Sequence, residues 1–397
     1  MKKFPVPVLV IFLGTLMFGL SYFMTWPFLA IILSRDFDMN PAEIGSVLSL
    51  AAFAGAGSAM ISGNLSDRFG RKVIILIANL AITIAFAIIA TAQSAFWIIL
   101  ASVVVVATRH LVDPPMRALI SDLCKDPKVK EMAFHLNYFM VNLGATTGPF
   151  IALYFGITAR QSTFWITSII MALYTLTLLW ILRDVKNKHD HEQIPNWKEV
   201  LGVLRRDKIL LWLILGSIFT AFTYAQQDST TVQYLTHFLD YEQAAFIFTF
   251  IVAGNAATVV LVQFPLLKLM SSWSYDTRIK FGVIGFFMGF VIYGINPVEF
   301  IPGWIIGTII LSIGEAVMFP TLGLKTDQIA PAHLKGTYFG ASNLYAIGYG
   351  IGPLVGGSII ALNYAIWLWP LASIICIIAF YAFHQSGKLY KRTLTAD

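Results

Sequence analysis

Ionisable side chains are scarce in this chain, and that scarcity excludes an ordinary soluble domain. Asp, Glu, Lys and Arg make up 12% of the 397 residues, against 57% hydrophobic residues, whereas about a quarter of a typical soluble domain is charged. The mean hydropathy is +0.74. The composition therefore predicts an all-α integral membrane protein, because helices satisfy their own backbone hydrogen bonds in lipid.

Cysteine is almost absent as well. Cys124 and Cys376 are the only two, and neither has a histidine or cysteine neighbour at metal-ligand spacing, so we expect no disulfide framework and no metal site. The sequence has no nucleophile with a nearby base, no phosphate-cradling glycine loop and no long soluble domain. A membrane enzyme or receptor is kept as an alternative, but we expect no enzyme and no nucleic-acid partner.

Long apolar runs are what the chain has in abundance. Runs of roughly 20 residues, enough to cross ~30 Å of hydrocarbon as a helix, recur with only short polar breaks between them. The pattern predicts twelve membrane spans. They lie at residues 5–33, 43–63, 73–92, 95–116, 133–156, 161–182, 208–236, 243–266, 279–296, 300–323, 335–361 and 363–384.

Lysine and arginine are distributed unevenly between the predicted loops. Of the 27 such residues, Arg109 lies within a span, Arg35 and Arg160 lie in loops on one side, and the rest lie on the other side. Because such an excess marks cytoplasmic loops, we predict cytoplasmic termini in a multi-pass protein of the cell inner membrane. The net charge of +6 follows from this topology. The longest polar stretch, 184–207, separates an N-terminal bundle (1–183) from a C-terminal bundle (208–397).

Two motifs recur at the same relative position in the two halves. An aspartate follows a proline by seven residues in both, at Asp122 and Asp327. Downstream, a glycine-glycine-proline motif with small residues four apart predicts close helix packing. Its residues are Gly144, Gly148 and Pro149 in the fifth span, and Gly348, Gly352 and Pro353 in the eleventh. Duplicated six-helix halves are a recurrent plan of transporters, with the substrate site at the midplane between them.

A short polar loop, GNLSDRFGRK at 63–72, separates the second and third spans. Its glycines permit a tight turn and close helix contact, while its aspartate can pair with a basic residue or a helix N-terminus. This G-x-L-x-D-R-x-G-R-K pattern resembles the signature loop of the major facilitator superfamily. The resemblance implies two pseudo-symmetric six-helix bundles and a conformational latch made by Gly63, Asp67, Arg68, Gly70, Arg71 and Lys72.

The loop between the eighth and ninth spans, KLMSSWSYDTRIK, should hold the duplicate of this latch. It retains Asp276, Arg278 and Lys280 but lacks the glycine frame. We therefore predict that the second latch is degenerate.

Four ionisable residues lie at predicted membrane depth, where each costs at least ~2.5 kcal/mol unless it faces a cavity or a partner. Arg109 and Asp113 are spaced i, i+4 in the fourth span and can pair along one helix face, for proton handling or as a purely structural ion pair.

Glu315 lies in LSIGEAVMFP among apolar neighbours, either as a proton carrier or as a satisfied hydrogen-bonding glutamate. Asp228 lies in a polar break, TYAQQDSTTVQYL, of the kind where transporter sites form. Tyr224 beside it adds a ring that can contact a cation.

The fifth-span motif resembles the antiporter motif of drug exporters. An acid in span seven and the G-E-x-x-x-x-P element in span ten resemble the drug:proton antiporters that export lipophilic cations, and this resemblance spans nearly the whole chain. It implies export of lipophilic cationic drugs or other small molecules by alternating access. The proton gradient would drive a monomer in the lipid bilayer, without a cofactor. A further carboxylate sometimes found in this group is replaced here by Asn137, which puts the proton stoichiometry in doubt.

The same resemblance implies proton coupling and cation binding by Asp228 and Glu315. We also expect Asp113 and Arg109 to take part in proton coupling, and Gln227, Tyr224, Asn142 and Trp26 to take part in substrate binding.

A proton-coupled oligopeptide symporter is the alternative. The stretches NYFMVNLGATTGP, YAQQDST and IGEAVMFPTLGL look similar to that family. The E-x-x-E-R element expected in its first helix is missing, however, because MFGLSYFMTWPFLAIIL carries no charge.

Overall fold

The computed structural model describes residues 4–183, 202, 205–331, 338 and 341–394. Contacts divide the chain into two compact units, of which the first comprises Met1–Met39 with Leu50–Glu192 and the second comprises Asn40–Ser49 with Gln193–Asp397. The predicted linker 184–207 lies outside the described residues apart from Gly202 and residues 205–207.

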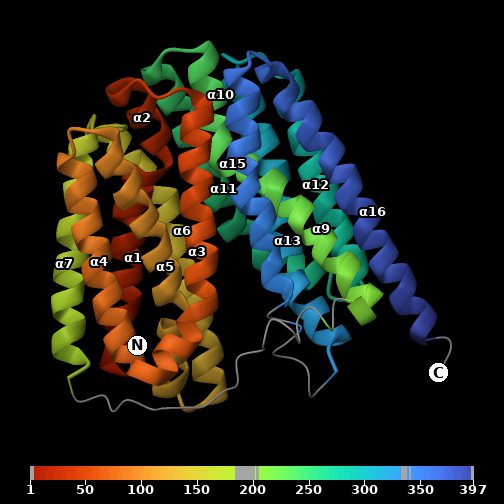
Figure 1. The fold of residues 1–397 in the computed structure, drawn as a ribbon. Coiled ribbons are helices and arrows are strands. Elements are labelled where there is room, and N and C mark those ends of the chain that lie inside the picture. The colour runs from red at the N-terminus through yellow and green to blue at the C-terminus, as the bar shows by residue number, and fades with distance from the viewer. Residues whose placement is uncertain (1–3, 184–201, 203–204, 332–337, 339–340, 395–397) are drawn as a thin grey trace. The chain divides into compact units, whose positions relative to one another are not determined.

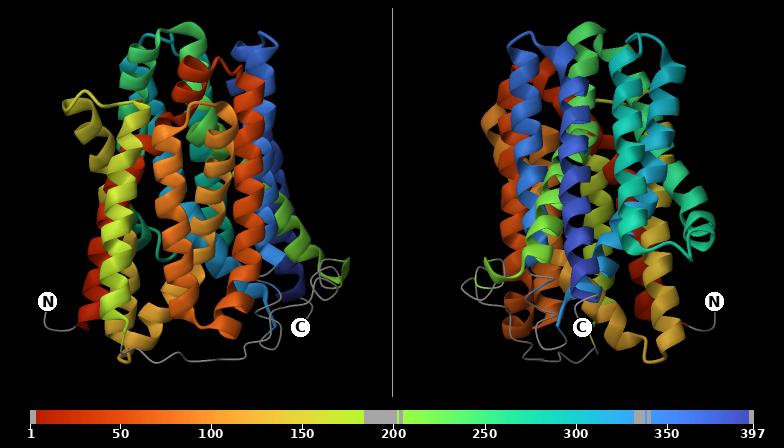
Figure 2. Two further views of the ribbon diagram at one scale, coloured as in Figure 1. Left: turned by 60° about the vertical axis from the view of Figure 1, so that its left-hand side comes forward. Right: turned by 90° about the vertical axis from the view of Figure 1, so that its right-hand side faces the viewer.

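The first unit is a helical bundle whose members run side by side along a common direction (Figures 1 and 2). A 3-10 turn interrupts the first predicted span, and α3 and α4 meet directly at Gly70. The elements are α1 (Val6–Thr25), η1 (Trp26–Phe28), α2 (Leu29–Phe37), α3 (Pro41–Phe69), α4 (Arg71–Thr91), α5 (Ala95–Leu123), α6 (Pro127–Tyr154), η2 (Gln161–Thr163) and α7 (Phe164–Ile181). The residues of α3 up to Ser49 are counted with the second unit.

The second unit is also a bundle of helices (Figure 1). Its first span is interrupted by a π-helical turn, η3, which is the feature that carries the candidate site. The elements are α9 (Lys208–Ala225), η3 (Gln226–Thr230), α10 (Thr231–Phe238), α11 (Tyr241–Leu269), α12 (Tyr275–Ile295), α13 (Ile301–Ile329), η5 (Asn343–Tyr345), α15 (Ala346–Ala361), η6 (Ala365–Trp367) and α16 (Leu368–Leu394).

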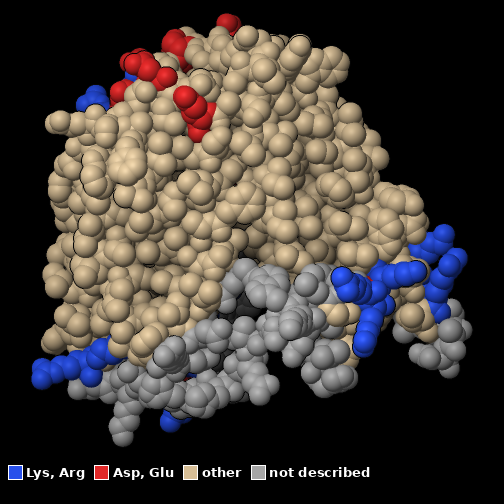
Figure 3. All heavy atoms as spheres, viewed as in Figure 1, with Lys and Arg blue, Asp and Glu red and all other residues tan. Residues whose placement is uncertain are grey.

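The helices have the length and composition of membrane spans. Within the described residues, eleven helical segments are long and apolar enough to cross a bilayer, and each coincides with a predicted span. The remaining predicted span, 133–156, falls on helix α6, which is not among the eleven. On the face drawn in Figure 3, the coloured charged side chains lie toward the ends of the helices and leave an uncharged band between them. The chain is a multi-pass membrane protein.

The glycine-glycine-proline motifs lie where helix backbones approach each other closely. A Cβ atom added at Gly144 on α6 would lie 2.6 Å from the carbonyl carbon of Gly19 on α1. In the second unit, a Cβ atom added at Gly352 on α15 would lie 2.6 Å from the Cβ of Ala225 and 3.1 Å from the carbonyl oxygen of Phe222 on α9. Each half therefore packs its fifth span on its first through glycine, as expected of a duplicated bundle.

Gly144→Ala is expected to destabilise the first unit by about 1–3 kcal/mol, because a methyl group at this contact must push two helix backbones apart. Thermal unfolding of the purified protein in detergent measures the effect. Gly57→Ala on α3 is the matched control, because nothing lies within 4 Å of a Cβ atom added there and alanine favours the helix. Equal melting temperatures for the Gly144→Ala and Gly57→Ala variants would contradict the tight contact.

Candidate functional site

The polar break of the seventh span is a π-helical turn. Residues Gln226–Thr230 form η3 between α9 and α10, and the Thr231 hydroxyl donates to the carbonyl oxygen of Gln226, five residues earlier, at 3.1 Å. Such turns are frequent at functional sites because they widen the helix locally. Asp228 is exposed on this turn, whereas Gln227 is only 4% exposed.

Glu315 on α13 accepts hydrogen bonds from two other helices. The Tyr224 hydroxyl, at the end of α9, donates to Oε1 at 3.2 Å. The Asn255 amide, on α11, donates from Nδ2 to Oε2 at 2.6 Å and to the Ser312 hydroxyl at 2.8 Å. Both carboxylate oxygens therefore have a donor, which is what an ionised carboxyl group in an apolar bundle requires.

Aromatic rings connect this carboxylate to Asp228. The Tyr349 hydroxyl, on α15, donates to Oδ2 of Asp228, and the rings of Tyr349 and Tyr224 have centroids 6.4 Å apart. Phe286 and Phe319 lie on the other sides of the Tyr224 ring, at 6.2 and 5.2 Å between centroids. The second unit thus contains two carboxylates, each bonded to a tyrosine, beside a four-ring aromatic cluster made by Tyr224, Phe286, Phe319 and Tyr349.

The aromatic cluster and its carboxylates combine the features that attract an organic cation. Ring faces are electron-rich and contact cations favourably, and a carboxylate supplies the opposite charge. Tyr224 is bonded to Glu315, and its ring adjoins that of Tyr349, which is bonded to Asp228. All of these residues belong to the second unit.

The predicted residues of the first unit are arranged differently from the expected ion pair. Asp113 pairs with Arg117, Oδ2 to Nε at 3.0 Å, one turn further along α5. Arg109 instead lies with its guanidinium carbon 4.5 Å from the centroid of the Tyr22 ring on α1. That ring stacks on Trp26 at 5.4 Å. Asp113 thus has Arg117 as its partner on the same helix, and Arg109 lies against a ring from another helix.

Asn142 and Asn137 lie on α6 of the same unit. Asn142 is partly buried. Asn137 accepts a hydrogen bond from the Thr15 hydroxyl on α1 at 2.9 Å.

The signature loop is a tight helix-to-helix turn. Gly70 separates α3 from α4 with a φ of +89°, a conformation that glycine adopts without the strain of a side chain. Arg71 forms an ion pair with Asp122 at the end of α5, and the Lys72 ammonium donates to the carbonyl oxygen of Arg183 at 3.3 Å. The side chains of Asp67 and Arg68, and the contacts of Gly63, lie outside the described residues.

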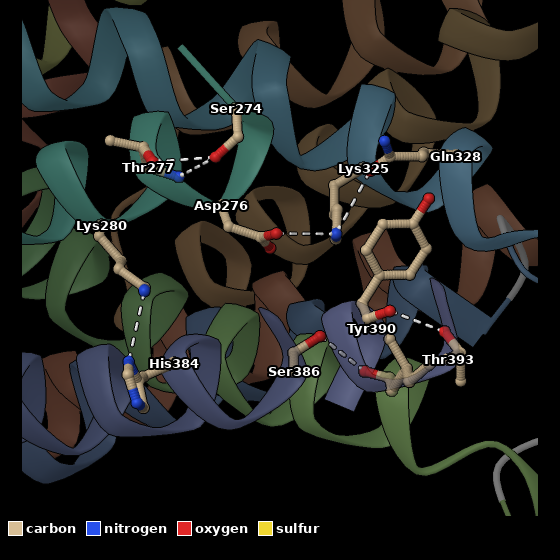
Figure 4. A network of polar contacts seen from close by, with 11 residues as sticks. Ser274, Asp276, Thr277, Lys280, Lys325, Gln328, His384, Ser386, Tyr390 and Thr393 are labelled. Carbon is tan, nitrogen blue, oxygen red and sulfur yellow. Dashed lines mark hydrogen bonds and ion pairs between the residues drawn. The ribbon is translucent and has the colours of Figure 1, made fainter. Parts of the chain in front are cut away.

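The corresponding place in the second unit also carries an ion pair, but here the acid lies at the start of the first helix and the base lies on the second. Asp276, in the first turn of α12, accepts from the Lys325 ammonium on α13 at 3.1 Å, and the Lys325 side chain is 0% exposed. The same ammonium donates to Gln328 at 3.3 Å and lies 3.8 Å from the centroid of the Tyr390 ring on α16 (Figure 4). The loop has lost its glycine frame, yet its acid still has a basic partner.

Several residues of the site are missed by sequence analysis. Asn255, Ser312, Tyr349 and Phe286 all touch the carboxylates or the aromatic cluster, and for the last three nothing in the local sequence separates them from packing residues. Asn255 is an amide within the apolar run IVAGNAATVV, which is a signal because polar side chains are costly in lipid. Lys325 lies just beyond the predicted cytoplasmic end of the tenth span, and its complete burial is seen only in the structure.

The fold and the signature loop define a membrane transporter of two duplicated helical units. The family model described as Major Facilitator Superfamily matches residues 11–346. The chain belongs to the Major Facilitator Superfamily.

Similarity to several known proteins extends over most of the chain. The uncharacterized MFS-type transporter YqjV of Bacillus subtilis (strain 168) is 28% identical over 349 residues, 87% of this chain and 84% of the relative. A Na(+), Li(+), K(+)/H(+) antiporter of Planococcus maritimus is 23% identical over 372 residues, 86% of each chain. The multidrug resistance protein MdtH of Photorhabdus laumondii is 25% identical over 389 residues, 92% of this chain and 90% of the relative.

Proposed function

We propose that this transporter exports lipophilic cations in exchange for protons by alternating access. The observation that carries the proposal is the pair of carboxylates, Glu315 and Asp228, each bonded to a tyrosine at one aromatic cluster of the second unit. The names of two relatives, a multidrug resistance protein and a cation/proton antiporter, support the same class of activity.

Competition between proton and cation is the proposed mechanism of coupling. A carboxylate can hold a proton or face a cation, and the two occupants exclude each other at one group. Protonation of Glu315 or Asp228 favours the inward-open state after proton entry, and loss of the proton leaves a carboxylate that binds the cation. Coupling requires only that proton and cation favour different states of the protein. Arg109 and Asp113 are proposed to take part in proton handling in the first unit.

The proposed setting is the cell inner membrane, with both termini cytoplasmic and the monomer as the working unit. The lysine and arginine excess of the predicted inner loops supports this orientation. The proton gradient across that membrane would supply the energy, and no cofactor is proposed.

A transport panel in proteoliposomes with an imposed pH gradient tests the proposal. We expect the wild-type protein to extrude an ethidium-like dye and to leave a labelled dipeptide unaccumulated. The Glu315→Gln variant should lose dye export, because an amide cannot exchange a proton. Accumulation of the dipeptide would favour the oligopeptide symporter instead, and exchange of Na⁺ or K⁺ without dye export would favour an alkali-cation antiporter.

A further inference from the structure

The Asn255 amide has one orientation that satisfies its neighbours. The Ser312 hydroxyl donates to the carbonyl oxygen of Thr308 on its own helix at 2.7 Å, so its proton is already used. Ser312 can therefore only accept from Asn255, and this turns the Nδ2 side of the amide toward Ser312 and toward Glu315. Ser312 is fully buried, so water does not compete for this contact.

The two donors to Glu315 differ in what they can do when the carboxyl group takes up a proton. An amide NH₂ group can only donate, whereas a tyrosine hydroxyl can donate or accept. A proton on Oε2 would face the Asn255 NH₂ group, donor against donor. A proton on Oε1 would face the Tyr224 hydroxyl, which can turn and accept it.

We propose that Asn255, oriented by Ser312, is a positioning residue that directs the exchangeable proton of Glu315 to Oε1, the oxygen facing Tyr224. The inference rests on the proposed proton-coupling role of Glu315. In the protonated state Oε2 is the carbonyl oxygen and keeps its hydrogen bond from Asn255. The proton then lies on the side of the Tyr224 ring, which adjoins the Tyr349 ring and, through Tyr349, Asp228.

Each element around Glu315 contributes a defined group to this arrangement. Helix α9 supplies Tyr224, α11 supplies Asn255, and α12 supplies Phe286, which stacks on Tyr224. Helix α15 supplies Tyr349, whose ring adjoins that of Tyr224 and whose hydroxyl donates to Asp228 on η3. Asn255 is therefore the group whose donor-only character distinguishes one oxygen of Glu315 from the other.

Infrared difference spectra of the full-length protein, recorded between acidic and alkaline pH, test this directly. The C=O band of protonated Glu315 is identified by its loss in Glu315→Gln. If Oε2 is the carbonyl oxygen, Asn255→Leu removes its hydrogen bond, and we expect the band to move to higher wavenumber. Ser312→Ala should move it in the same direction by a smaller amount, and Ser312→Thr, which keeps the hydroxyl, should restore the wild-type position.

The control is Thr258→Val on the same helix as Asn255. The Thr258 hydroxyl donates to the carbonyl oxygen of Gly254 in its own helix at 2.7 Å, so its loss should leave the band unmoved. A band that stays in place in Asn255→Leu and moves in Tyr224→Phe would overturn the inference, because the carbonyl oxygen would then be Oε1. Absence of any Glu315-dependent band would instead contradict the proton-coupling role itself, so the two failures are distinguishable.

Discussion

Asp276→Ala is expected to lower the free energy of unfolding of the second unit by about 3–5 kcal/mol, because it leaves a buried ammonium group without its counter-charge. The Lys325 side chain is 0% exposed, and its ammonium lies 3.1 Å from the Asp276 carboxylate. The Gln328 amide oxygen and the Tyr390 ring would remain beside it, but neither carries a negative charge. Thermal and denaturant unfolding of the full-length protein in detergent measure the loss.

Two further variants separate charge burial from a general effect of substitution. Asp113→Ala breaks the Asp113–Arg117 pair, whose side chains are 54% and 66% exposed, and it should cost less than about 1 kcal/mol. Adding Lys325→Met to Asp276→Ala removes the unpaired charge and should recover most of the stability. The interpretation is wrong if Asp276→Ala unfolds like the wild type, or if the double variant is no more stable than the single one.

Glu315→Gln and Asp228→Asn are each expected to abolish proton-gradient-driven export while leaving the protein folded. Each substitution keeps the shape of the side chain and removes its capacity to lose a proton. In Glu315→Gln the amide oxygen can still accept from Asn255 while the new NH₂ group donates to Tyr224, and in Asp228→Asn the amide oxygen can still accept from Tyr349. Dye transport into inverted membrane vesicles, which is the direction of cellular efflux, is energised by an imposed pH gradient. The loss is measured as a fall to the rate of vesicles without the protein.

Glu299→Gln is the matched control for these variants. Glu299 is an exposed acid between α12 and α13, away from the aromatic cluster, and its neutralisation should leave the rate unchanged. Unimpaired efflux by both Glu315→Gln and Asp228→Asn would eliminate the proposed coupling. Melting temperatures near that of the wild type would show that any loss of efflux is not a loss of folding.

The membrane spans are readable from sequence because lipid imposes a simple rule on composition. A helix must present about 20 apolar residues to cross the bilayer, and every such run in the described chain is helical. The helix ends are less accurate. The tenth predicted span ends at residue 323 and the twelfth at 384, whereas α13 continues to Ile329 and α16 to Leu394. Helices continue past the apolar run when neighbouring helices supply partners, as Asp276 and Tyr390 do for Lys325.

Only part of the candidate site can be predicted from the sequence. Asp228 and Glu315 are conspicuous because a charge in an apolar run is costly wherever it lies. The expected pairing of Arg109 with Asp113 rests on helical spacing alone, whereas the structure places Asp113 beside Arg117 and Arg109 against a ring from another helix. The second latch is predicted to be degenerate because its loop lacks the glycine frame, and the basic partner of Asp276 lies 49 residues away on α13, outside that loop.

The sequence by itself determined that this chain crosses the membrane repeatedly, that its halves are duplicated, and which few charges fall within apolar runs. Those properties follow from local composition and spacing, which the hydrocarbon solvent selects directly. The tertiary structure alone decided which donor faces which oxygen of Glu315, which tyrosine holds Asp228, and how Lys325 is neutralised. These contacts depend on the packing of three or four helices. Because a hydrogen bond forms only over a short distance, the sequence of one helix does not reveal its partners on the others.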